Sequence, residues 1–586
     1  KTKRPDMVQW RDSKVTRNGV DLAVRTWSED RSPTVVLVHG YPDANHVWEK
    51  VAERLSQDFK VVAYDVRGAG NSSVPKGRAA YKLRELRDDL HAVMDAVCPD
   101  EKVHLVAHDW GSIQTWESVT DPGAEQRIAS YTTLSGPCLD HVGQWMKANL
   151  KQNPAAVLNQ LSHSWYIGAF QLPVLAPTLW KAGLAKAWPS VLKRTENLDI
   201  EPSPSQLKDG VHGIELYRAN MLPCLLKPRE RYTKVPVQLI VAREDNYVRP
   251  NMLEDLPKWT DQLWRRELDT GHWGPLQQYP DVTARWVREF IQHIEGAPAS
   301  APLKRAKVSA NSPQGPDAGK VVLVTGAGSG IGRETALAFG RRGATVLCTD
   351  INADAAAATA STITAEGGNA LSRKCDVSNT RSMETLAGYV EKEFGALDIV
   401  INNAGIGLSG GLLDTSVKDW QQVLGVNLWG VIHGSRLFAR QMIDQGKSGH
   451  IVNVASAAAF MPSRILPAYA TSKSAVLMLS ECLRAELAEY RIGVSAICPG
   501  IINTPIAGNT RFVGVDDEEQ NRRRENAQKL YQRRAFTPDR VAQAIVRAVE
   551  SNQAVVPVSP EAVGMQWLGR LSPALARNLA QVEITP

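Results

Sequence analysis

Three polar residues in the first half of the sequence are spaced so that a nucleophile, an acid and a base could act together. Asp109 lies in the run KVHLVAHDWGS (102–112), where an apolar strand turns sharply into a helix. Small neighbours such as Gly111 are typical of a turn that holds its central residue in a strained conformation. Asp245 and His272 each follow a later apolar segment. A carboxylate at the turn would attack saturated carbon, and a histidine–acid pair would let water cleave the ester that forms.

Aspartate at this turn disfavours a serine esterase, because acyl transfer to serine needs a hydroxyl at that position. Taken singly, Asp245 could be a helix cap and His272 a core histidine. The order nucleophile, acid, histidine, with each residue just after a predicted strand, favours a joint catalytic role.

The second half carries a glycine-rich turn and a tyrosine–lysine pair. The apolar strand 320–325 leads into GAGSGIGRETALAFG (326–340), whose glycines would let the backbone approach a pyrophosphate at a helix N-terminus. Tyr469 and Lys473 stand four apart in YATSK, on one face of a helix. We expect the ammonium to lower the pKa of the tyrosine, which makes it a general base for alcohol oxidation. Ser456, after the strand 450–454, can hold the substrate oxygen.

Residues 34–290 resemble the epoxide hydrolase and haloalkane dehalogenase branch of the α/β-hydrolases. His39–Pro42 matches the HGxP motif of that branch, and YDVRGAGNS (64–72) matches its DxRGxGxS segment. The resemblance implies that the backbone N–H groups of Tyr41 and Trp110 form the oxyanion site.

Two lid tyrosines favour the epoxide branch. Tyr166 precedes Phe170-Gln171 in the YxxxFQ context of that branch, and Tyr217 in YRANM matches the second tyrosine. The resemblance implies that both protonate the alkoxide as the ring opens. Haloalkane dehalogenases usually carry Asn where Tyr41 stands, and fluoroacetate dehalogenases usually carry Arg where Trp110 stands. A dehalogenase remains the alternative.

Residues 320–560 resemble the classical short-chain dehydrogenase/reductase family. Asp350 would accept the ribose hydroxyls of NAD and repel a 2′-phosphate, and Ser329 and Ile351 stand where NADP enzymes usually carry a base, so we expect NAD. The resemblance implies that Ser456, Tyr469 and Lys473 are catalytic and that Asn427 supports a proton relay. The cofactor residues it implies, besides Tyr469 and Lys473, are Gly326, Ser329, Gly330, Ile331, Gly332, Asp350, Asp376, Val377, Asn403, Ala404, Gly405, Pro499, Gly500, Ile502 and Thr504.

These residues require two α/β folds in one chain. Val-, Ile- and Leu-rich runs alternate with helical patterns in both halves, which is typical of parallel sheets between helices. The strands predicted from these runs are 34–38, 60–64, 102–107 and 236–242 in the first half and 320–325, 344–348, 397–402 and 450–454 in the second. The fold class is therefore an α/β-hydrolase fold with a helical lid, followed by a doubly wound parallel sheet of the Rossmann type. The expected domains are a hydrolase domain 1–295 with its lid at about 137–233, a linker 296–319 rich in Pro, Ala, Ser and Gly, and a dehydrogenase domain 320–586.

Composition excludes several other classes of function. A net charge of +6 on 586 residues, without a long basic run, makes nucleic acid an unexpected partner. Seven scattered cysteines without CxxC spacing argue against a zinc site, and we expect no metal. They also favour a reducing compartment, and no pattern of a signal peptide is present, so we expect a cytoplasmic protein.

Two apolar stretches bear on the substrate and on the membrane. The lid segment WYIGAFQLPVLAPTLW and the C-terminal stretch Glu561–Leu579 suit a lipid-like epoxide and peripheral contact with the inner membrane face. The alternative is that each stretch packs on its own domain. Pro173 and Pro177 argue against a transmembrane helix at 165–188.

The fused pair most resembles actinobacterial epoxide hydrolases that carry a C-terminal dehydrogenase domain. We expect the first domain to open an epoxide to a diol and the second to interconvert an alcohol and a ketone with NAD. Both substrates would be small lipophilic molecules, and we expect a homo-oligomer formed through the dehydrogenase domain. A further alternative is that the hydrolase-fold domain acts only as a scaffold for the dehydrogenase.

Overall fold

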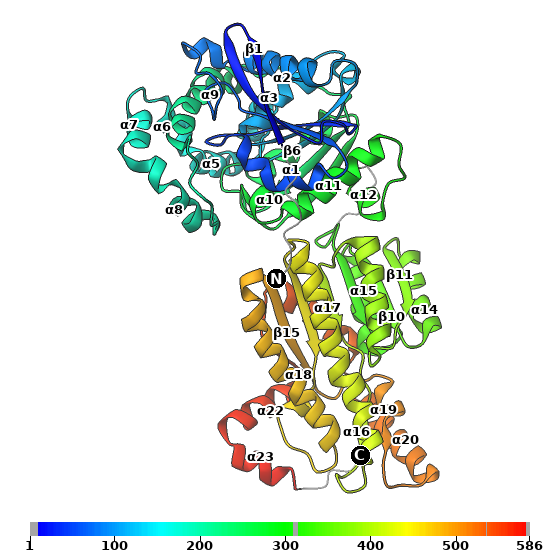
Figure 1. Cartoon of the computed structure of the whole chain (residues 1–586). Coiled ribbons are helices and arrows are strands. Elements are labelled where there is room, and N and C mark those ends of the chain that lie inside the picture. The colour runs from blue at the N-terminus through cyan, green and yellow to red at the C-terminus, as the bar shows by residue number, and fades with distance from the viewer. Residues whose placement is uncertain (1–9, 309–314, 535, 582–586) are drawn as a thin grey trace, which may run out of the picture. The chain divides into compact units, whose positions relative to one another are not determined.

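The computed structural model describes residues 10–308, 315–534 and 536–581. The chain divides into two compact units, Lys1–Ser309 and Ala310–Pro586 (Figure 1). Each unit contains one large, mainly parallel sheet flanked by helices. The predicted fold class, an α/β-hydrolase fold followed by a doubly wound sheet, is confirmed.

The sheet of the first unit has eight strands in the order β1-β2-β4-β3-β5-β6-β7-β8. β2 runs antiparallel to both of its neighbours, and from β4 to β8 all pairings are parallel. The predicted strands of this half are confirmed to within about a residue, because buried β-branched runs fit a strand that is covered on both faces. The strands are β1 (Trp10–Arg17), β2 (Val20–Trp27), β3 (Thr34–Val38), β4 (Lys60–Tyr64), β5 (Val103–His108), β6 (Ile128–Leu134), β7 (Val237–Ala242) and β8 (Leu263–Leu268).

Helices of the first unit fall into two groups. One group flanks the sheet, and the other, inserted between β6 and β7, forms the lid. The long apolar stretch of the lid is broken into short helices with a kink at Gly183. The flanking helices are α1 (Glu49–Leu55), α2 (Leu83–Val97), α3 (Trp110–Val119), α10 (Gly274–Gln277) and α11 (Pro280–Ile294), and the lid helices are α4 (Leu139–Gln152), α5 (Pro154–His163), α6 (Trp165–Gln171), α7 (Leu175–Leu179), α8 (Ala185–Glu196) and α9 (Gln206–Leu226).

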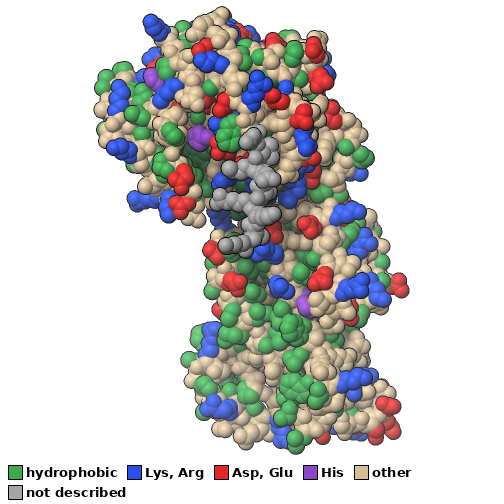
Figure 2. Space-filling model, viewed as in Figure 1, with side chains coloured by type: hydrophobic (Ala, Val, Ile, Leu, Met, Phe, Trp, Pro, Cys, Tyr) green, Lys and Arg blue, Asp and Glu red, His purple; other side chains and the backbone are tan. Residues whose placement is uncertain are grey.

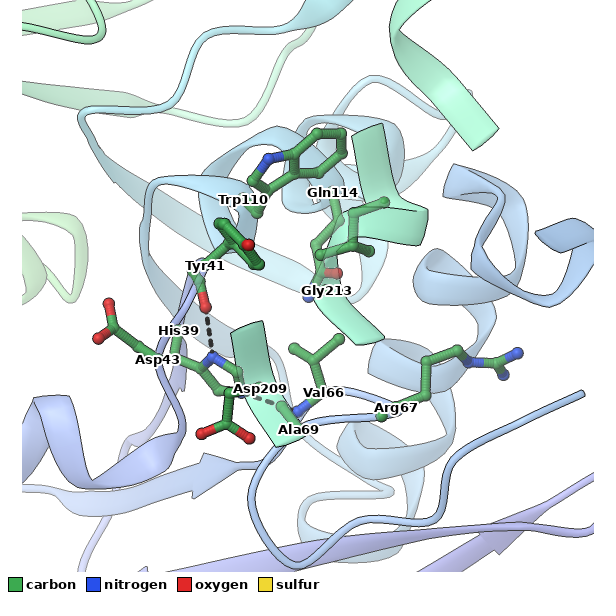
Figure 3. A pocket seen from close by; sticks show the side chains of 13 residues that line it. His39, Tyr41, Asp43, Val66, Arg67, Ala69, Trp110, Gln114, Asp209 and Gly213 are labelled. Carbon is green, nitrogen blue, oxygen red and sulfur yellow. Dashed lines mark hydrogen bonds between the residues drawn. The ribbon is translucent and has the colours of Figure 1, made fainter. Parts of the chain in front are cut away.

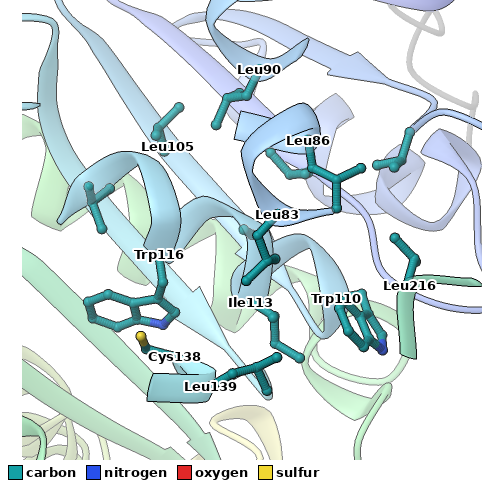
Figure 4. Packing of buried hydrophobic residues seen from close by; sticks show 14 of the residues in the cluster. Leu83, Leu86, Leu90, Leu105, Trp110, Ile113, Trp116, Cys138, Leu139 and Leu216 are labelled. Atoms are coloured by element: carbon teal, nitrogen blue, oxygen red, sulfur yellow. The ribbon is translucent and has the colours of Figure 1, made fainter. Parts of the chain in front are cut away.

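Helix α3 is buried along its whole length. Trp110, Ile113 and Trp116 of α3 pack with Leu83 and Leu86 of α2 in one apolar cluster (Figure 4). Burial of large side chains contributes roughly 1.5–3 kcal/mol each. The core therefore holds rigidly the helix that starts at Asp109.

The first half of the predicted linker 296–319 is ordered instead. Helix α12 (Ala301–Ala306) has Leu303 fully buried against Trp264 and Phe290. The backbone N–H of Val308 donates to the carbonyl of Leu263 at the end of β8. Apolar contacts and a backbone hydrogen bond thus attach this segment to the first unit, which its Pro- and Ala-rich composition did not indicate.

The sheet of the second unit has seven strands in the order β11-β10-β9-β12-β14-β15-β17, all parallel. The strand order reverses between β9 and β12, and open sheets of this kind bind ligands at such a point. A separate pair, β13 (Leu408–Ser409) and β16 (Arg511–Phe512), lies outside this sheet. The strands of the seven-stranded sheet are β9 (Val321–Thr325), β10 (Thr345–Asp350), β11 (Asn369–Lys374), β12 (Ile399–Asn402), β14 (Gly449–Val454), β15 (Ile492–Pro499) and β17 (Val555–Val558).

Helices flank the sheet of the second unit, and the first of them, α13, follows β9 after the glycine-rich turn (Figure 1). Most carry an apolar face toward the sheet; in α21 the buried residues include Val541 and Ile545. The helices are α13 (Gly330–Arg341), α14 (Ala353–Ala365), α15 (Thr380–Phe394), α16 (Val417–Leu424), α17 (Gly430–Asp444), α18 (Pro467–Glu486), α19 (Ile506–Asn509), α20 (Asp517–Arg534), α21 (Pro538–Glu550), α22 (Pro560–Leu571) and α23 (Pro573–Leu579).

Both apolar stretches noted in the sequence leave large side chains exposed. Trp165 and Val174 of the lid are 72% and 71% exposed, and Trp567 and Leu571 of α22 are also exposed. Figure 2 shows hydrophobic side chains on the surface of the second unit. Each stretch therefore packs on its own unit only in part. In the described parts of the chain, no helix is long and apolar enough to cross a membrane.

Candidate active sites

Asp109 occupies the turn between β5 and α3 with φ 52° and ψ −125°. A non-glycine residue in this region costs on the order of 1–3 kcal/mol, which the surrounding packing must offset. Gly111 lets the start of α3 pack closely against the end of β3, because a Cβ at this position would overlap the carbonyl oxygen of Val38 and lie 2.6 Å from that of His39. The turn presents the Asp109 side chain at the carboxyl edge of the sheet.

Asp245 and His272 reach this turn from the loops after β7 and β8. His272 Nδ1 lies 2.8 Å from Asp245 Oδ2, and Nε2 lies 3.5 Å from Asp109 Oδ1. The second oxygen of Asp245 accepts hydrogen bonds from the backbone N–H groups of Tyr247 (2.8 Å) and Val248 (2.9 Å). Asp245 thus orients the imidazole of His272 so that Nε2 faces the carboxylate of Asp109, at the turn between β5 and α3 that we call the elbow.

Charge around His272 favours its protonated form. Burial alone would lower the pKa of His272, but the charge of Asp245 and hydrogen bonds with Asp109 and Asp245 outweigh burial and raise it well above its ordinary value. Burial would raise the pKa of Asp245, yet the charge of His272 and the hydrogen bonds it accepts lower it. With both carboxylates ionised, the imidazolium is stabilised between two anions.

The predicted oxyanion residues lie on either side of Asp109. The backbone N–H of Tyr41 donates to Asp109 Oδ2 at 2.7 Å. Trp110 is the first residue of α3, where backbone N–H groups have no partner within the helix. The Tyr41 hydroxyl donates to the carbonyl of Gly210 and accepts from Trp180 Nε1, both at 2.9 Å. The Tyr41 side chain therefore anchors the lid, and its backbone faces the carboxylate.

The two lid tyrosines belong to one aromatic cluster beside the elbow. The ring centroids of Tyr166 and Tyr217 lie 6.1 Å apart, and Tyr217 lies 4.8 Å from Trp110. Burial, together with the negative charge of Asp109, raises the pKa of both phenols well above their ordinary value. Both side chains are neutral near pH 7 and able to donate a proton.

Tyr247 is a neighbour of the site that the motifs did not identify. Its ring lies 5.1 Å from that of His272 and 5.6 Å from that of Tyr166. Tyr247 therefore contacts both His272 and the lid. Its position two residues after Asp245 was the available signal, but an aromatic residue in a loop does not specify its direction.

A small cavity of about 20 Å³ borders Tyr41 and Trp110 (Figure 3). That volume holds about one water molecule. The carboxylates of Asp43 and Asp209 line it, and burial raises the pKa of Asp209 to about 7. Asp209 Oδ1 accepts a hydrogen bond from the backbone N–H of Gly70 at 2.8 Å. Asp209 therefore fixes the first turn of α9 to the loop after β4.

The residues predicted to carry out hydride chemistry meet at the carboxyl edge of the second sheet. Lys473 Nζ lies 5.9 Å from the ring centroid of Tyr469 on α18 and donates to the carbonyl of Val454 at 2.9 Å. Ser456 follows β14 directly. Asn427 lies in a π-helical turn between α16 and α17, and such turns are frequent at functional sites.

The expected effect of Lys473 on Tyr469 is wrong for this structure. Burial raises the pKa of Tyr469 to about 12, and a hydrogen bond with Ser456 offsets it only partly. Burial also lowers the pKa of Lys473 to about 8. Loss of water disfavours both charged forms, and at this separation the ammonium does not compensate.

The glycine-rich turn between β9 and α13 fits a dinucleotide. A Cβ on Gly332 would overlap the carbonyl oxygen of Gly326 and lie 2.5 Å from Asn403 Nδ2, so the turn closes tightly over the end of the sheet. Asp350 ends β10, and its Oδ2 accepts a hydrogen bond from the backbone N–H of Gly328 at 2.9 Å. The turn and the carboxylate thus form one surface at the N-terminus of α13.

The remaining predicted cofactor residues lie in the same edge region. Asn403 Nδ2 donates to the carbonyl of Thr325 at 3.0 Å, which ties the loop after β12 to the glycine-rich turn. Thr504 lies against Gly330, with 3.2 Å between the Thr504 Cβ and a Cβ built on that glycine. The others follow the ends of β11, β12 and β15 or start α13: Ser329, Ile331, Asp376, Val377, Ala404, Gly405, Pro499, Gly500 and Ile502. Among the described residues, no cluster of three or more His, Cys, Asp or Glu could hold a metal ion.

Comparison with known proteins covers both units. The alpha/beta hydrolase fold model matches residues 33–279, and the short chain dehydrogenase model matches residues 320–512. "Probable oxidoreductase EphD" of Mycobacterium tuberculosis is 40% identical over 583 residues, which is 97% of this chain and 98% of that protein. The chain belongs to the EphD family. It is therefore an enzyme that joins a hydrolase-fold domain to a short-chain dehydrogenase domain, as the sequence predicted.

Other relatives match the dehydrogenase half of this EphD family member. The 2,3-dihydro-2,3-dihydroxybenzoate dehydrogenase of Bacillus subtilis is 36% identical over 186 residues, which is 32% of this chain and 71% of that protein. A crystal structure of a short-chain dehydrogenase/reductase from Burkholderia phymatum in complex with NAD is 30% identical. It covers 47% of this chain and 98% of its own, with a TM-score of 0.42.

Proposed function

We propose that the first domain is an epoxide hydrolase and that the second is an NAD-dependent alcohol/ketone oxidoreductase. For the hydrolase, one observation carries the proposal. An aspartate stands at the elbow, 3.5 Å from His272, with two neutral tyrosines in the same aromatic cluster. A serine enzyme would need neither a carboxylate there nor proton donors in the lid.

The hydrolase reaction has two steps. Asp109 attacks a carbon of the epoxide, its C–O bond breaks, and Tyr166 or Tyr217 gives a proton to the alkoxide. His272 then takes a proton from water, whose oxygen attacks the ester carbonyl of Asp109 while the Tyr41 N–H stabilises the oxyanion. Collapse of this intermediate breaks the ester C–O bond to the substrate, the imidazolium of His272 protonates the departing alkoxide, and the second proton of the water returns to the tyrosinate, so that the diol leaves and the enzyme is regenerated. Esterification removes the charge of Asp109, which lowers the pKa of His272, so that the imidazole can lose its proton and is available to take one from water.

Halide release from carbon is the competing hydrolase reaction. The Tyr41 hydroxyl is engaged by Gly210 and Trp180. It is therefore not free to bind a leaving halide, which disfavours a dehalogenase. Neutral phenols at Tyr166 and Tyr217 instead suit an alkoxide that needs a proton.

The hydrolase proposal predicts diol and no halide. We expect the full-length protein to convert styrene oxide and a long-chain fatty epoxide to diols, and to release no chloride from a 1-chloroalkane. Tyr166→Phe and Tyr217→Phe together should lower diol formation by about 100-fold or more, since the alkoxide loses its proton donor. Tyr232→Phe, at an exposed tyrosine, is the control. Chloride release without diol would establish the dehalogenase alternative.

We also propose a lipophilic substrate for the hydrolase. The apolar aromatic site and the exposed apolar residues of the lid, such as Trp165 and Val174, suit a long hydrocarbon chain. In the same assay the fatty epoxide should have the higher kcat/KM. Faster turnover of styrene oxide would remove the lipophilic assignment.

For the dehydrogenase, Tyr469 is a neutral phenol and would give its proton to the oxygen of a ketone that Ser456 holds, as hydride reduces the carbonyl carbon; in the oxidative direction the phenolate would take that proton back from the alcohol. A bound nicotinamide supplies the hydride acceptor, or the donor in the reverse direction. Lys473 lies under the ring of Tyr469 and would stabilise a phenolate as it forms. Asp350 supports NAD, because its carboxylate lies at the glycine-rich turn, where a 2′-phosphate would meet like charge.

Replacing Asp350 by Ala tests the choice of cofactor. NADH should bind the wild-type protein at least about tenfold more tightly than NADPH. In the variant this ratio of affinities should fall by a similar factor, because NADH loses its ribose hydrogen bonds to Asp350 and NADPH is no longer repelled through its 2′-phosphate. Asp354→Ala, at an exposed carboxylate of α14, is the matched control. Fluorescence titration measures the dissociation constants of NADH and NADPH. Tighter binding of NADPH than of NADH by the wild type would contradict the assignment of NAD as the cofactor.

A further inference from the structure

A third carboxylate faces the hydrolase triad and takes no part in the reaction described above. Glu196 is the last residue of α8 and is 9% exposed. Neither of its carboxylate oxygens has a hydrogen bond of ordinary geometry among the described residues, although the backbone N–H groups of His272 and Trp273 lie close enough to stabilise its charge. A buried carboxylate with so little hydrogen bonding costs free energy, so its presence beside the loop of His272 needs a physical reason.

Packing holds Glu196 against the loop that carries His272. Leu192 and Leu198, on either side of it in sequence, are buried in the same cluster as Trp273. A Cβ on Gly271 would overlap Glu196 Oε2 and lie 2.7 Å from Glu196 Cδ. The carboxylate therefore fills the space that a side chain at position 271 would take, directly before the histidine.

The charged and titratable groups around Glu196 come from two loops. His272 lies on the loop after β8, and Asp245 and Tyr247 lie on the loop after β7. Burial raises the pKa of Glu196 to about 7, although the charge of His272 and the N–H groups of His272 and Trp273 act against it. Near neutral pH, Glu196 therefore changes its charge.

We propose that Glu196 is a positioning residue that holds the His272 loop and, through its charge, sets the pH range in which His272 takes a proton from water. The inference rests on the proposed hydrolase function. In the alkyl-enzyme, Asp109 is a neutral ester, so Asp245 and Glu196 are the carboxylates left beside His272. The proton moves from water to His272 Nε2, and an ionised Glu196 stabilises the imidazolium that forms.

The charge of Glu196 should be visible in the pH profile of diol formation by the full-length protein. His272 must be neutral to act as a base, so kcat rises as pH rises through its pKa. Glu196→Gln removes a nearby negative charge. The variant should shift this rise of kcat, the acidic limb of the profile, to lower pH by about half a unit or more. It should also lower the plateau value of kcat above the limb by about threefold to tenfold. Asp199→Asn, at an exposed aspartate just after α8, is the control and should leave the profile unchanged.

A conservative variant distinguishes the effect of the negative charge of Glu196 from the effect of its side-chain packing against the His272 loop. Glu196→Asp keeps the charge and should keep the acidic limb of the wild type, even where the shorter side chain lowers thermal stability. A purely structural role would lower the melting temperature of Glu196→Gln without moving the limb. Superimposable pH profiles for the wild type and Glu196→Gln would overturn the proposal.

A measurement without substrate distinguishes this proposal from the hydrolase assignment. In protein labelled with ¹³C-histidine, the signal of His272, assigned by its loss in His272→Gln, should titrate at lower pH in Glu196→Gln than in the wild type. That shift would stand even if neither diol nor halide forms, in which case the proposed hydrolase function fails alone. Identical titration curves would contradict the role of Glu196 whatever the reaction.

Discussion

Replacing His272 by Gln should stop the release of diol and leave the substrate bound covalently to Asp109. The first step needs Asp109 and a lid tyrosine, whereas the second needs the base that lies 3.5 Å from the nucleophile. The loss of a general base typically costs 10²–10⁴-fold in that step. Intact mass spectrometry should show an adduct, and peptide mapping should locate it in the segment that contains Asp109.

The mass of the adduct also identifies the chemistry. Ring opening adds the whole mass of an epoxide, whereas displacement from a haloalkane adds the substrate less one hydrogen halide. Asp109→Asn should form no adduct and lower diol formation by about 10⁴-fold or more. His163→Gln, at a half-buried lid histidine of α5 that has no contact with the triad among the described residues, is the control. An adduct on any residue other than Asp109 would contradict the assignment.

Tyr469→Phe should abolish hydride transfer and leave cofactor binding intact. Without the tyrosine hydroxyl, α18 has neither a phenolate to accept the proton of an alcohol nor a phenol to give one to a ketone, so hydride transfer should slow by about 10²–10⁴-fold in either direction. NADH fluorescence measures both the rate and the dissociation constant. A variant that keeps the rate would exclude Tyr469 as the base.

Tyr490→Phe is the matched control, because Tyr490 is exposed just beyond the end of α18. Diol formation should be unchanged in Tyr469→Phe, and oxidation should be unchanged in Asp109→Asn, because each catalytic set lies within its own unit. The scaffold alternative makes a different prediction. If the hydrolase-fold domain only supports its neighbour, Asp109→Asn will alter neither reaction.

Much of the fold could be predicted because its signals are local. Buried runs such as 34–38 and 60–64 identified strands to the residue, since a strand covered on both faces is apolar throughout. The ordered segment 301–308 was missed. Its attachment depends on Leu303 meeting Trp264 and Phe290, which no pattern within the segment indicates.

The candidate sites followed from residue types and spacing where geometry is set along the chain. Tyr469 and Lys473 share a face because they are four residues apart in a helix. The elbow at Asp109 could be inferred because a strand that turns directly into a helix requires small neighbours such as Gly111.

The sequence by itself determined the two fold classes, the order of the domains and the chemistry available to each site. The tertiary structure alone decided which groups share a low-dielectric environment. It raises the pKa of Tyr469 where spacing to Lys473 predicted a decrease, and it brings Glu196 against the loop of His272 from 76 positions earlier in the chain. The physical reason is that burial and charge–charge distance act through space, and neither has a signature in local spacing.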